Sequence, residues 1–371
     1  MARRHGSPLP LALQVPLAAA IRLALAAPTT IGLEGMAHIA ERAGRGFANL
    51  PFNRKRLARA EENLREVFPA WTTDERREHA LRAYGHIFRL GVELAYMPRI
   101  LSPDSWFRHL YPGQLGPAVD HMLSGKPCIL ITGHVGNWEL VGAAIAMLGF
   151  PLHAVYRPLD LKPLDRWVRE SRQRQGMTMV SKFGAVGDLP DCLRNGRPVG
   201  LVADQNGGDR GVFIPCFGRL TSTYKSIGLL ALQFDATMVC GFARRLTPQE
   251  RRARGHSAGD PHAATLGYTV EVVDVFGPET YRAQPDPLFY LTARYRRAME
   301  QMILRAPDQY LWMHRIWRSR PAHERAGKPF PPALKDKLRA LPWMTEDELA
   351  RIVDRSDRES RATASAASPT G

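Results

Sequence analysis

Cysteine is scarce in this 371-residue sequence, which has four cysteines and no Cys-x-x-Cys pair. Disulfide frameworks belong to short secreted chains, so the sequence predicts free thiols in a reducing compartment. No group of histidines and cysteines has the spacing of a zinc site, and we expect no metal. The cysteines are Cys128, Cys192, Cys216 and Cys240.

Acidic residues are also few, with 36 Asp and Glu against 51 Lys and Arg, so the net charge is +15 and the pI about 10.1. Such a surplus indicates an acidic partner, either nucleic acid or an anionic membrane surface. Only eight basic residues are lysines, and codon bias can account for the arginines. With 44% hydrophobic residues, the chain can bury a large core in one large domain or two ordinary ones, which excludes a disordered or fibrous protein.

A long uninterrupted apolar run is missing as well. The most apolar stretch, residues 9–33, follows Arg3 and Arg4, contains Ala24-Leu25-Ala26 and is broken by Gln14, Arg22 and three prolines. A membrane span needs about 20 apolar residues. An interfacial anchor, a poor transmembrane helix and a cleaved signal all remain open, and the basic residues that follow favour the cytoplasmic face. We assign residues 1–48 to this membrane-associating segment.

Residues 49–112 are predicted to form a helical subdomain. From about residue 53 to 100 the pattern indicates two helices, the second starting at a capping box formed by Thr72 and Glu75. The apolar positions of that helix recur at helical spacing, and we assign them to core packing.

From residue 113 the pattern alternates between strands and helices. This predicts an α/β fold with a mixed, mostly parallel sheet flanked by helices, over residues 113–320. Residues 247–263 are expected to form a polar loop. Residues 321–371 form a C-terminal extension, expected to be disordered from about residue 355. The five predicted strands span residues 128–132, 151–156, 198–203, 237–243 and 268–275.

The most specific motif is His134-x4-Glu139, which follows the first of these strands. A histidine can act as a general base near neutral pH when an acid orients its ring. Gly133 and Gly136 allow close backbone approach, and Asn137 is a polar donor. The alternative is an ordinary loop histidine with satisfied hydrogen bonds.

A second motif, Gly255-x-Ser257-x-Gly259, has the pattern of a nucleophile elbow. That motif functions only on a tight turn between a strand and a helix. Here it lies in the most polar loop of the chain with no strand before it. We therefore do not assign it a catalytic role.

Three further segments combine basic and aromatic residues: 155–158, 203–219 and 307–318. Taken singly, each could be ordinary structure, with surface arginines and core phenylalanines. Together they have the composition of a site for an anionic lipid.

In this order, the segments resemble the lipid A late acyltransferases, the lauroyl and myristoyl transferases of the lysophospholipid acyltransferase superfamily. The resemblance covers roughly residues 53–320. It rests on residues 63–69 and on four blocks: His134 to Glu139 (His-x-Gly-Asn-Trp-Glu), Tyr156-Arg157-Pro158, Asp204-Gln205-Asn206 with Gly211 to Gly218, and Tyr310 to Trp317.

Three features depart from the family pattern. Leu161-Lys162-Pro163 replaces an asparagine-proline pair, Cys216 replaces a common aromatic residue, and the N-terminal segment is less hydrophobic than usual.

The resemblance implies a membrane-associated acyltransferase at the cytoplasmic face of the inner membrane. It would move an acyl chain from an acyl carrier protein or coenzyme A thioester to a hydroxyl of a phosphorylated, lipid A-type acceptor. No cofactor, metal or nucleic acid is implied. The same chemistry on another acceptor, such as a phosphoinositide mannoside or an amino-acid lipid, stays open. A nucleic-acid binder is disfavoured because the aromatic residues fall within the four blocks.

The implied mechanism has His134 as the general base, with Glu139 holding its ring and no covalent acyl-enzyme. Candidate oxyanion donors are the N–H groups around Gly136 and Asn137, or Arg157. An apolar pocket is expected to measure the chain length. The arginines expected to bind phosphate are Arg157, Arg210, Arg315 and Arg318, and the other candidate binding residues are Asp204, Gln205, Phe213, Phe217 and His314.

Overall fold

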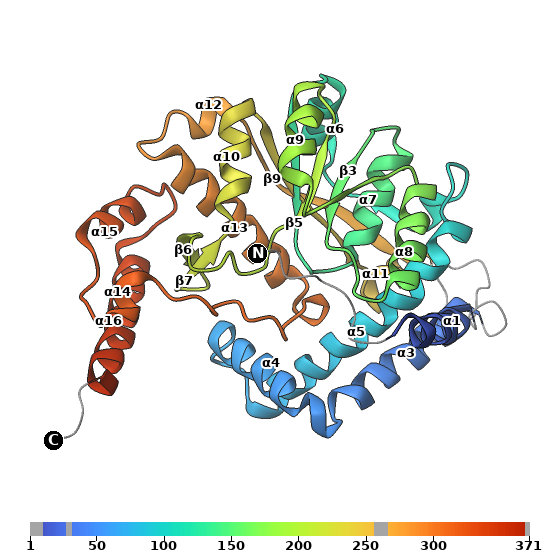
Figure 1. Cartoon of the computed structure of the whole chain (residues 1–371), viewed down its shortest axis with the longest axis horizontal. Helices are drawn as coiled ribbons and strands as arrows, with labels where there is room; N and C mark the ends of the chain where they lie inside the picture. The colour runs from blue at the N-terminus through green and yellow to red at the C-terminus, as the bar shows by residue number, and fades with distance from the viewer. Residues whose placement is uncertain (1–9, 27–31, 256–265, 368–371) are drawn as a thin grey trace.

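A seven-stranded sheet lies at the centre of the computed structural model, which describes residues 10–26, 32–255 and 266–367 (Figure 1). The strand order is β1-β9-β8-β2-β5-β3-β4, and only β8 and β9 pair antiparallel. The predicted fold class, an α/β fold with a mixed and mostly parallel sheet, is confirmed. The strands are β1 (Leu110–Pro112), β2 (Cys128–Thr132), β3 (His153–Tyr156), β4 (Thr178–Ser181), β5 (Val199–Val202), β8 (Thr237–Arg245) and β9 (Tyr268–Phe276).

The five predicted strands are present as β2, β3, β5, β8 and β9. The sequence did not predict β1, β4 or the separate antiparallel hairpin of β6 (Val212–Cys216) and β7 (Arg219–Thr223). β2 lies in the middle of the sheet, and all five of its residues are buried. A strand covered on both faces reads as a continuous apolar run, which explains why its bounds could be predicted.

Helices cover both faces of the sheet (Figure 1). One face carries the helices that connect β1 to β2, β2 to β3 and β3 to β4. The other face carries the helices that connect β4 to β5 and β5 to β8. Right-handed βαβ connections require this division. The first face has α6 (Gly116–Leu123), α7 (Trp138–Met147) and α8 (Lys162–Arg174), and the second has α9 (Ala185–Arg194), α10 (Lys225–Phe234) and α13 (Pro287–Arg305).

The N-terminal helices pack along the edge of the sheet where its parallel strands end. The two helices predicted between residues 53 and 100 are α4 (Arg54–Val67) and α5 (Thr73–Ile100), and the capping box of Thr72 and Glu75 is present. Helix α3 (Leu33–Ala48) lies against α5, and Gly44 permits this approach because a Cβ there would lie 2.6 Å from the Tyr84 carbonyl oxygen.

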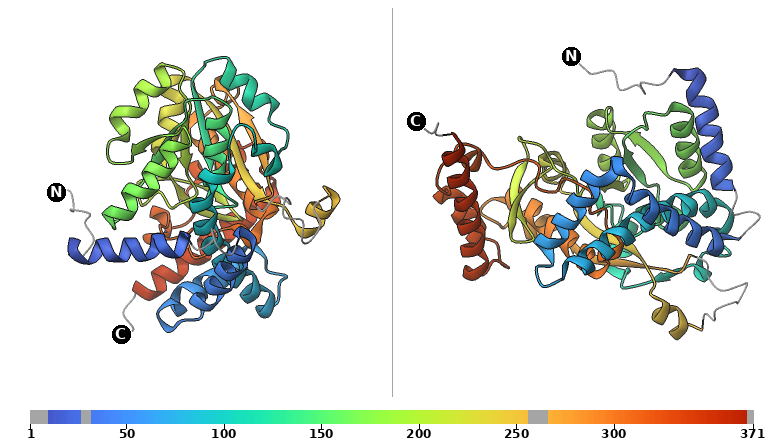
Figure 2. Two further views of the ribbon diagram at one scale, coloured as in Figure 1. Left: turned by 90° about the vertical axis from the view of Figure 1, so that its right-hand side faces the viewer. Right: turned by 90° about the horizontal axis from the view of Figure 1, so that it is seen from below.

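Helix α1 (Leu11–Ala26) lies at the periphery beside α8, at the opposite end of the molecule from the C-terminal helix α16 (Glu346–Ala367) (Figure 2). Within the described ranges, we find no helix whose length and apolar character would allow it to cross a membrane.

Two expectations about loops were wrong. Residues 248–253 form a short helix, α11 (Pro248–Ala253), because Thr247 and Glu250 make a capping box. Disorder from residue 355 is not found either, since α16 (Glu346–Ala367) continues beyond it after α14 (Ala322–Arg325) and α15 (Pro332–Arg339). Leu349 and Ile352 are each 1% exposed on its inner face, and packing of that face stabilises the helix despite the Ser- and Ala-rich sequence. Ser257 and Gly259 lie outside the described residues.

Candidate active site

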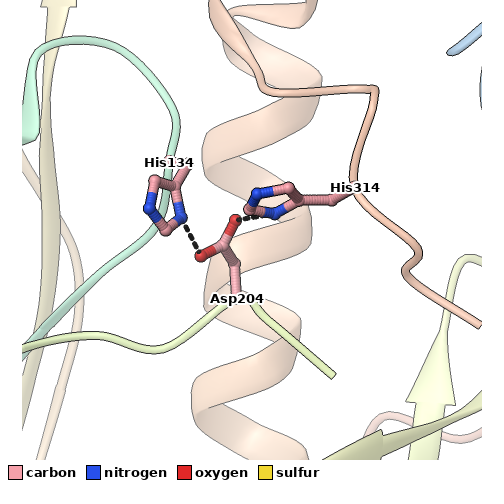
Figure 3. Close-up of side chains that lie close together, drawn as sticks. All are labelled: His134, Asp204 and His314. Carbon is pink, nitrogen blue, oxygen red and sulfur yellow. Dashed lines mark hydrogen bonds and ion pairs between the residues drawn. The ribbon is translucent and has the colours of Figure 1, made fainter. Parts of the chain in front are cut away.

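His134 and Asp204 meet where two neighbouring parallel strands end. His134 lies two residues beyond β2, and Asp204 lies two residues beyond β5, its hydrogen-bonded neighbour. The Nδ1 atom of His134 is 2.7 Å from Oδ1 of Asp204, whose side chain is fully buried (Figure 3). Loops at the carboxyl ends of parallel strands are the usual place for ligand sites in α/β proteins.

The carboxylate sets both the charge and the orientation of the imidazole. Burial disfavours the charged ring, but the charge and hydrogen bond of Asp204 outweigh it and raise the pKa of His134. The pKa of Asp204 is lowered despite its burial, because both histidine rings and Arg296 favour the carboxylate. With Nδ1 donating to Asp204, the other ring nitrogen, Nε2, is a free acceptor that points away from the carboxylate (Figure 3).

His314 lies on the other side of the same carboxylate. Its Nδ1 atom is 3.8 Å from Oδ2 of Asp204, and its ring centroid is 4.9 Å from that of His134. Burial lowers the pKa of His314 to about 4, so its ring is neutral near pH 7. Both its Nδ1 and Oδ2 of Asp204 are buried without a hydrogen-bond partner.

Among the described residues, these three are the one group of His, Cys, Asp and Glu side chains arranged closely enough to surround a metal ion. Bonds from zinc to nitrogen and oxygen are about 2.0–2.2 Å long. The 2.7 Å separation of Nδ1 and Oδ1 is that of a direct hydrogen bond and is too short for two ligand atoms of one ion. We therefore interpret the cluster as a hydrogen-bonded proton acceptor.

The role predicted for Glu139 in holding the ring of His134 was wrong, because Asp204 occupies that position. Glu139 instead forms a two-point ion pair with Arg172 of α8, with 2.8 Å between Arg172 Nε and Glu139 Oε2. Trp138 Nε1 also donates to it at 3.0 Å. Glu139 lies in the first turn of α7, which directs its side chain to α8, and its charge contributes only the smaller part of the rise in the pKa of His134.

The predicted oxyanion donors, the N–H groups of Gly136 and Asn137, are already occupied. Gly136 donates to the Gln309 carbonyl at 2.9 Å, and Asn137 donates to the Ala243 carbonyl at 2.8 Å. Gly136 must be glycine, since its φ is +61° and a Cβ would lie 2.0 Å from the Ala243 oxygen.

The backbone N–H groups that remain available lie one and two residues beyond Asn137. Asn137 caps α7 through its side chain, which accepts from the N–H of Leu140. The N–H groups of Trp138 and Glu139 donate no hydrogen bond to any described residue. Amides in the first turn of a helix favour negative charge.

A cavity of about 1140 Å³ opens beside His134. Most of its lining is apolar. Several polar residues also line it, among them His134, Glu139, Arg157, Lys182 and Gln205. Sites for organic ligands are typically concave, apolar and about 300–1,000 Å³, with a few converging polar groups. This cavity exceeds that range and is suited to hydrocarbon.

A family model described as bacterial lipid A biosynthesis acyltransferase matches residues 13–319 of the chain. The chain belongs to this family.

Similar proteins include the lipid A biosynthesis palmitoleoyltransferase of Escherichia coli (strain K12), 25% identical over 276 residues, which covers 74% of this chain and 82% of that protein. The lipid A biosynthesis lauroyltransferase of the same strain is 26% identical over 288 residues, with coverage of 75% and 84%. The lipid A biosynthesis acyltransferase of Haemophilus influenzae is 23% identical over 273 residues, with coverage of 72% and 77%.

Only some of the residues predicted to bind substrate line the cavity of this acyltransferase. Arg157 and Gln205 line it together with His134 and Glu139. Arg157 is half exposed and makes one loose ion pair, 3.8 Å from Asp160, so its guanidinium is available at the rim.

Besides the oxyanion candidates Gly136 and Asn137, seven predicted binding residues do not line this cavity. Asp204 and His314 are two of them, and both lie beside His134. Phe213 lies on β6, and Phe217 occupies the hairpin turn with φ +51° and its N–H bonded to Glu300. Both belong to the hairpin of β6 and β7, and Phe217 packs against the main hydrophobic core. Arg210, Arg315 and Arg318 are exposed surface residues.

Sequence reasoning also missed the buried polar residues that support the loop of residues 133–137, which carries His134. Glu93 of α5 is fully buried; it accepts from Asn137 at 3.0 Å and from the Tyr268 hydroxyl at 2.6 Å. Arg89 and Arg245 form ion pairs with Glu93 at 2.8 and 3.3 Å. Their charges lower the pKa of Glu93, although its burial acts in the opposite direction.

His86, one helical turn before Arg89, donates from Nε2 to the Gly136 carbonyl at 3.0 Å. These polar residues recur at helical spacing among the apolar positions of α5. That pattern was the available signal, because charged groups are rarely buried without partners.

Proposed function

We propose that this enzyme transfers an acyl chain from a thioester, carried by acyl carrier protein or coenzyme A, to a hydroxyl of a lipid A-type acceptor. The observation that carries the proposal is the His134–Asp204 pair, with Nε2 of His134 free beside a large apolar cavity. The names of the relatives support the acceptor class, since each is a lipid A biosynthesis transferase.

In the proposed reaction, Nε2 of His134 removes the proton of the acceptor hydroxyl while Asp204 stabilises the imidazolium. The oxygen attacks the thioester carbonyl, forming a C–O bond and a tetrahedral oxyanion. The amides of Trp138 and Glu139 are placed to stabilise that charge, at about 3 kcal/mol for each donor. Collapse breaks the C–S bond, and the leaving thiolate takes the proton from Nε2.

Direct transfer without an acyl-enzyme agrees with the state of the cysteines. All four are buried, and none lines the cavity. Burial raises the pKa of Cys128 and of Cys216 to about 12, so neither is a thiolate near neutral pH.

We further propose that α1 holds the enzyme at the cytoplasmic face of the inner membrane. Leu13, Val15 and Leu23 of this helix are 55%, 53% and 75% exposed. Large apolar side chains grouped on one exposed helix are typical of a helix lying in a membrane interface. Because α1 packs beside α8, whose residues line the cavity, the membrane would supply lipid close to the site.

The test is to incubate purified enzyme with lauroyl-acyl carrier protein or lauroyl-coenzyme A, against a panel of lipid A precursors and other phospholipids, and to identify products by mass. We expect a new ester on a lipid A precursor and less than about 1% of that rate for His134→Ala. His38→Ala, at an exposed histidine of α3, is the control and should retain full activity. Transfer by His134→Ala at the wild-type rate, or transfer confined to other lipids, would contradict the proposal.

A further inference from the structure

A buried arginine contacts the acid of the His134–Asp204 pair. Arg296 of α13 is 1% exposed, and its Nη1 atom donates to the backbone carbonyl of Asp204 at 2.6 Å. Its Nε atom donates to Sγ of Cys216, on β6, at 3.3 Å. Within the described part of the chain, Arg296 forms no ion pair with a carboxylate. Arginines are almost never fully buried unless they are paired, so this one is an exception, and it lies beside the site.

The sheet leaves the carbonyl of Asp204 without a backbone partner. Pairing between β5 and β2 continues as far as the N–H of Ala203, which donates to the Thr132 carbonyl at 2.9 Å. One residue further, no backbone N–H of a described residue donates to the Asp204 carbonyl. A buried carbonyl requires a donor. Arg296 therefore supplies this donor at the point where the strand ladder ends.

The orientation of this peptide decides where the side chain of Asp204 points. Its Oδ1 lies 2.7 Å from Nδ1 of His134, and a Cβ on Gly133 would lie only 3.3 Å from the Cβ of Asp204. The two strand ends are therefore packed closely, and a rotation of the Asp204 peptide would carry the carboxylate away from Nδ1. Arg296 opposes such a rotation from α13, a 19-residue helix with eleven buried residues.

Asp204 is also the ionised group that balances the charge of Arg296. The guanidinium helps to lower the pKa of the Asp204 carboxyl, and the carboxylate helps to raise the pKa of Arg296. Glu300, one turn further along α13, accepts a backbone N–H of the β6–β7 turn at 2.8 Å, and burial raises its pKa to about 7. The remaining groups near the guanidinium are uncharged near pH 7: Cys216, Tyr310 and His314.

We infer that Arg296 is a positioning residue for acyl transfer, which holds the Asp204 carboxylate against His134 by bonding to the Asp204 carbonyl. The inference rests on the proposed function, in which His134 is the base. Arg296 does not line the cavity and acts only through Asp204. Cys216 holds Nε of the same guanidinium, so the plane of that group is fixed at two points.

Two substitutions separate the hydrogen bond from the size of the side chain. Arg296→Met removes the charge and all donors from a side chain of similar length, whereas Arg296→Lys keeps a charge and a donor. We expect Arg296→Met to lower kcat at least about tenfold, with KM for lauroyl-coenzyme A changed less than about twofold, and Arg296→Lys to recover most of the loss. Arg297→Met is the matched control and should behave as wild type, because its guanidinium lies over the ring of Trp343, 5.1 Å from the ring centroid.

A second measurement tests whether Arg296 acts through Asp204. An Asp204→Ala enzyme has no carboxylate left to position, so adding Arg296→Met should lower its residual kcat by less than about threefold. A residue that only stabilises the fold would lower kcat by the same factor in both backgrounds.

The titration of His134 gives a readout that needs no turnover. Because Asp204 raises the pKa of His134, release of the carboxylate should lower the midpoint, by about one pH unit in Arg296→Met. Loss of the positive charge alone would move the midpoint in the opposite direction. NMR of the full-length enzyme with isotope-labelled histidine follows the midpoint, and the resonance that disappears in His134→Gln assigns it. The other ionisable groups beside His134 are Glu139, which stays paired with Arg172, and His314, which is neutral in this range.

Wild-type kcat in Arg296→Met, equal effects of this substitution with and without the Asp204 carboxylate, or an unchanged or higher midpoint of His134 would each overturn the inference. Melting temperatures identify a variant that fails to fold. Arg296→Gln, whose amide is too short to reach the Asp204 carbonyl yet stays polar beside Cys216, then replaces Arg296→Met with the same expectations. Failure of the proposed function would be seen differently, as wild-type enzyme that transfers no acyl group from either thioester while the midpoint of His134 still falls in Arg296→Met.

Discussion

Nδ1 of His134 lies 2.7 Å from Oδ1 of Asp204, although the two residues are 70 positions apart in the chain. Glu139, the glutamate of the same motif, forms an ion pair with Arg172 instead. The histidine and the acid that orients it thus come from two different strand ends, and the parallel pairing of β2 and β5 fixes the distance between them.

Replacing this acid tests whether it orients the base. Asp204→Asn keeps the shape of the side chain but removes the charge that stabilises the imidazolium, and we expect kcat to fall about 10²- to 10⁴-fold. KM for the thioester should change little. The control is Asp120→Asn, at an exposed position of α6, which should behave as wild type. Wild-type kcat in Asp204→Asn would exclude the orienting role.

The pH dependence of the reaction follows from the raised pKa of His134. The base works only when neutral, so kcat/KM should rise with pH and level off above an apparent pKa higher than the ordinary 6.5. His314, with a pKa of about 4, is already neutral in that range and should not contribute. Any residual activity of Asp204→Asn should level off at a lower pH than wild type, because the group that raises the pKa is gone.

The pair of Glu139 and Arg172 is expected to matter for stability as well as for activity. Glu139→Gln leaves a mostly buried guanidinium with weaker partners, and we expect the free energy of unfolding to fall by about 1–3 kcal/mol. Adding Arg172→Met removes the unpaired charge and should recover most of that loss in a urea titration. Equal destabilisation of the single and double variants would show that the loss does not come from the unpaired charge of Arg172.

Membrane association is tested by making exposed apolar positions of α1 polar. The triple variant Leu13→Ser, Val15→Ser, Leu23→Ser should bind vesicles containing anionic phospholipid about tenfold or more weakly, since all three apolar side chains are lost. Ala19→Ser, on the same helix, is the control. Unchanged sedimentation of the triple variant with vesicles would place the membrane contact elsewhere.

The C-terminal helix α16 lies beyond the residues that match the family model, yet it belongs to the main core. Ile352→Ser should lower the free energy of unfolding by about 2–5 kcal/mol, because the side chain is fully buried. Asp354→Ser, on the exposed face of the same helix, should cost little. We expect the Ile352→Ser enzyme to stay active well below its unfolding midpoint, and a loss of activity without unfolding would assign α16 a role in the reaction.

Several parts of the fold could be predicted because their local signals agree with their environment. β2 and β8 are continuous apolar runs in the middle of the sheet, and α5 begins at a strong capping box. β4 was missed because it is four residues long at the edge of the sheet, with exposed and half-buried positions. α16 was missed because its stability comes from tertiary packing, which composition does not show.

The site was predictable in its residues but not in its contacts. His134 and Asp204 were both candidates, yet the sequence favoured Glu139 as the partner of His134 because it is near in the chain. Which acid reaches Nδ1 depends on the strand order, which places β5 next to β2. Glu93 had only a weak signal, its helical spacing with His86 and Arg89, and Arg172 lies in no motif. The structure identifies the role of each by its ion-pair partners.

The hydrogen bond from His86 to the Gly136 carbonyl has a practical consequence for anyone shortening this protein. Removing the chain through α1 would leave the hydrogen bonds described for Gly136 and Asn137 in place. Removing it through α5 would take away His86 and Glu93, leaving Asn137 and Arg245 with buried polar atoms that have lost their partners. The sheet and its flanking helices are therefore not a separable catalytic unit, and the smallest active fragment has to retain α5.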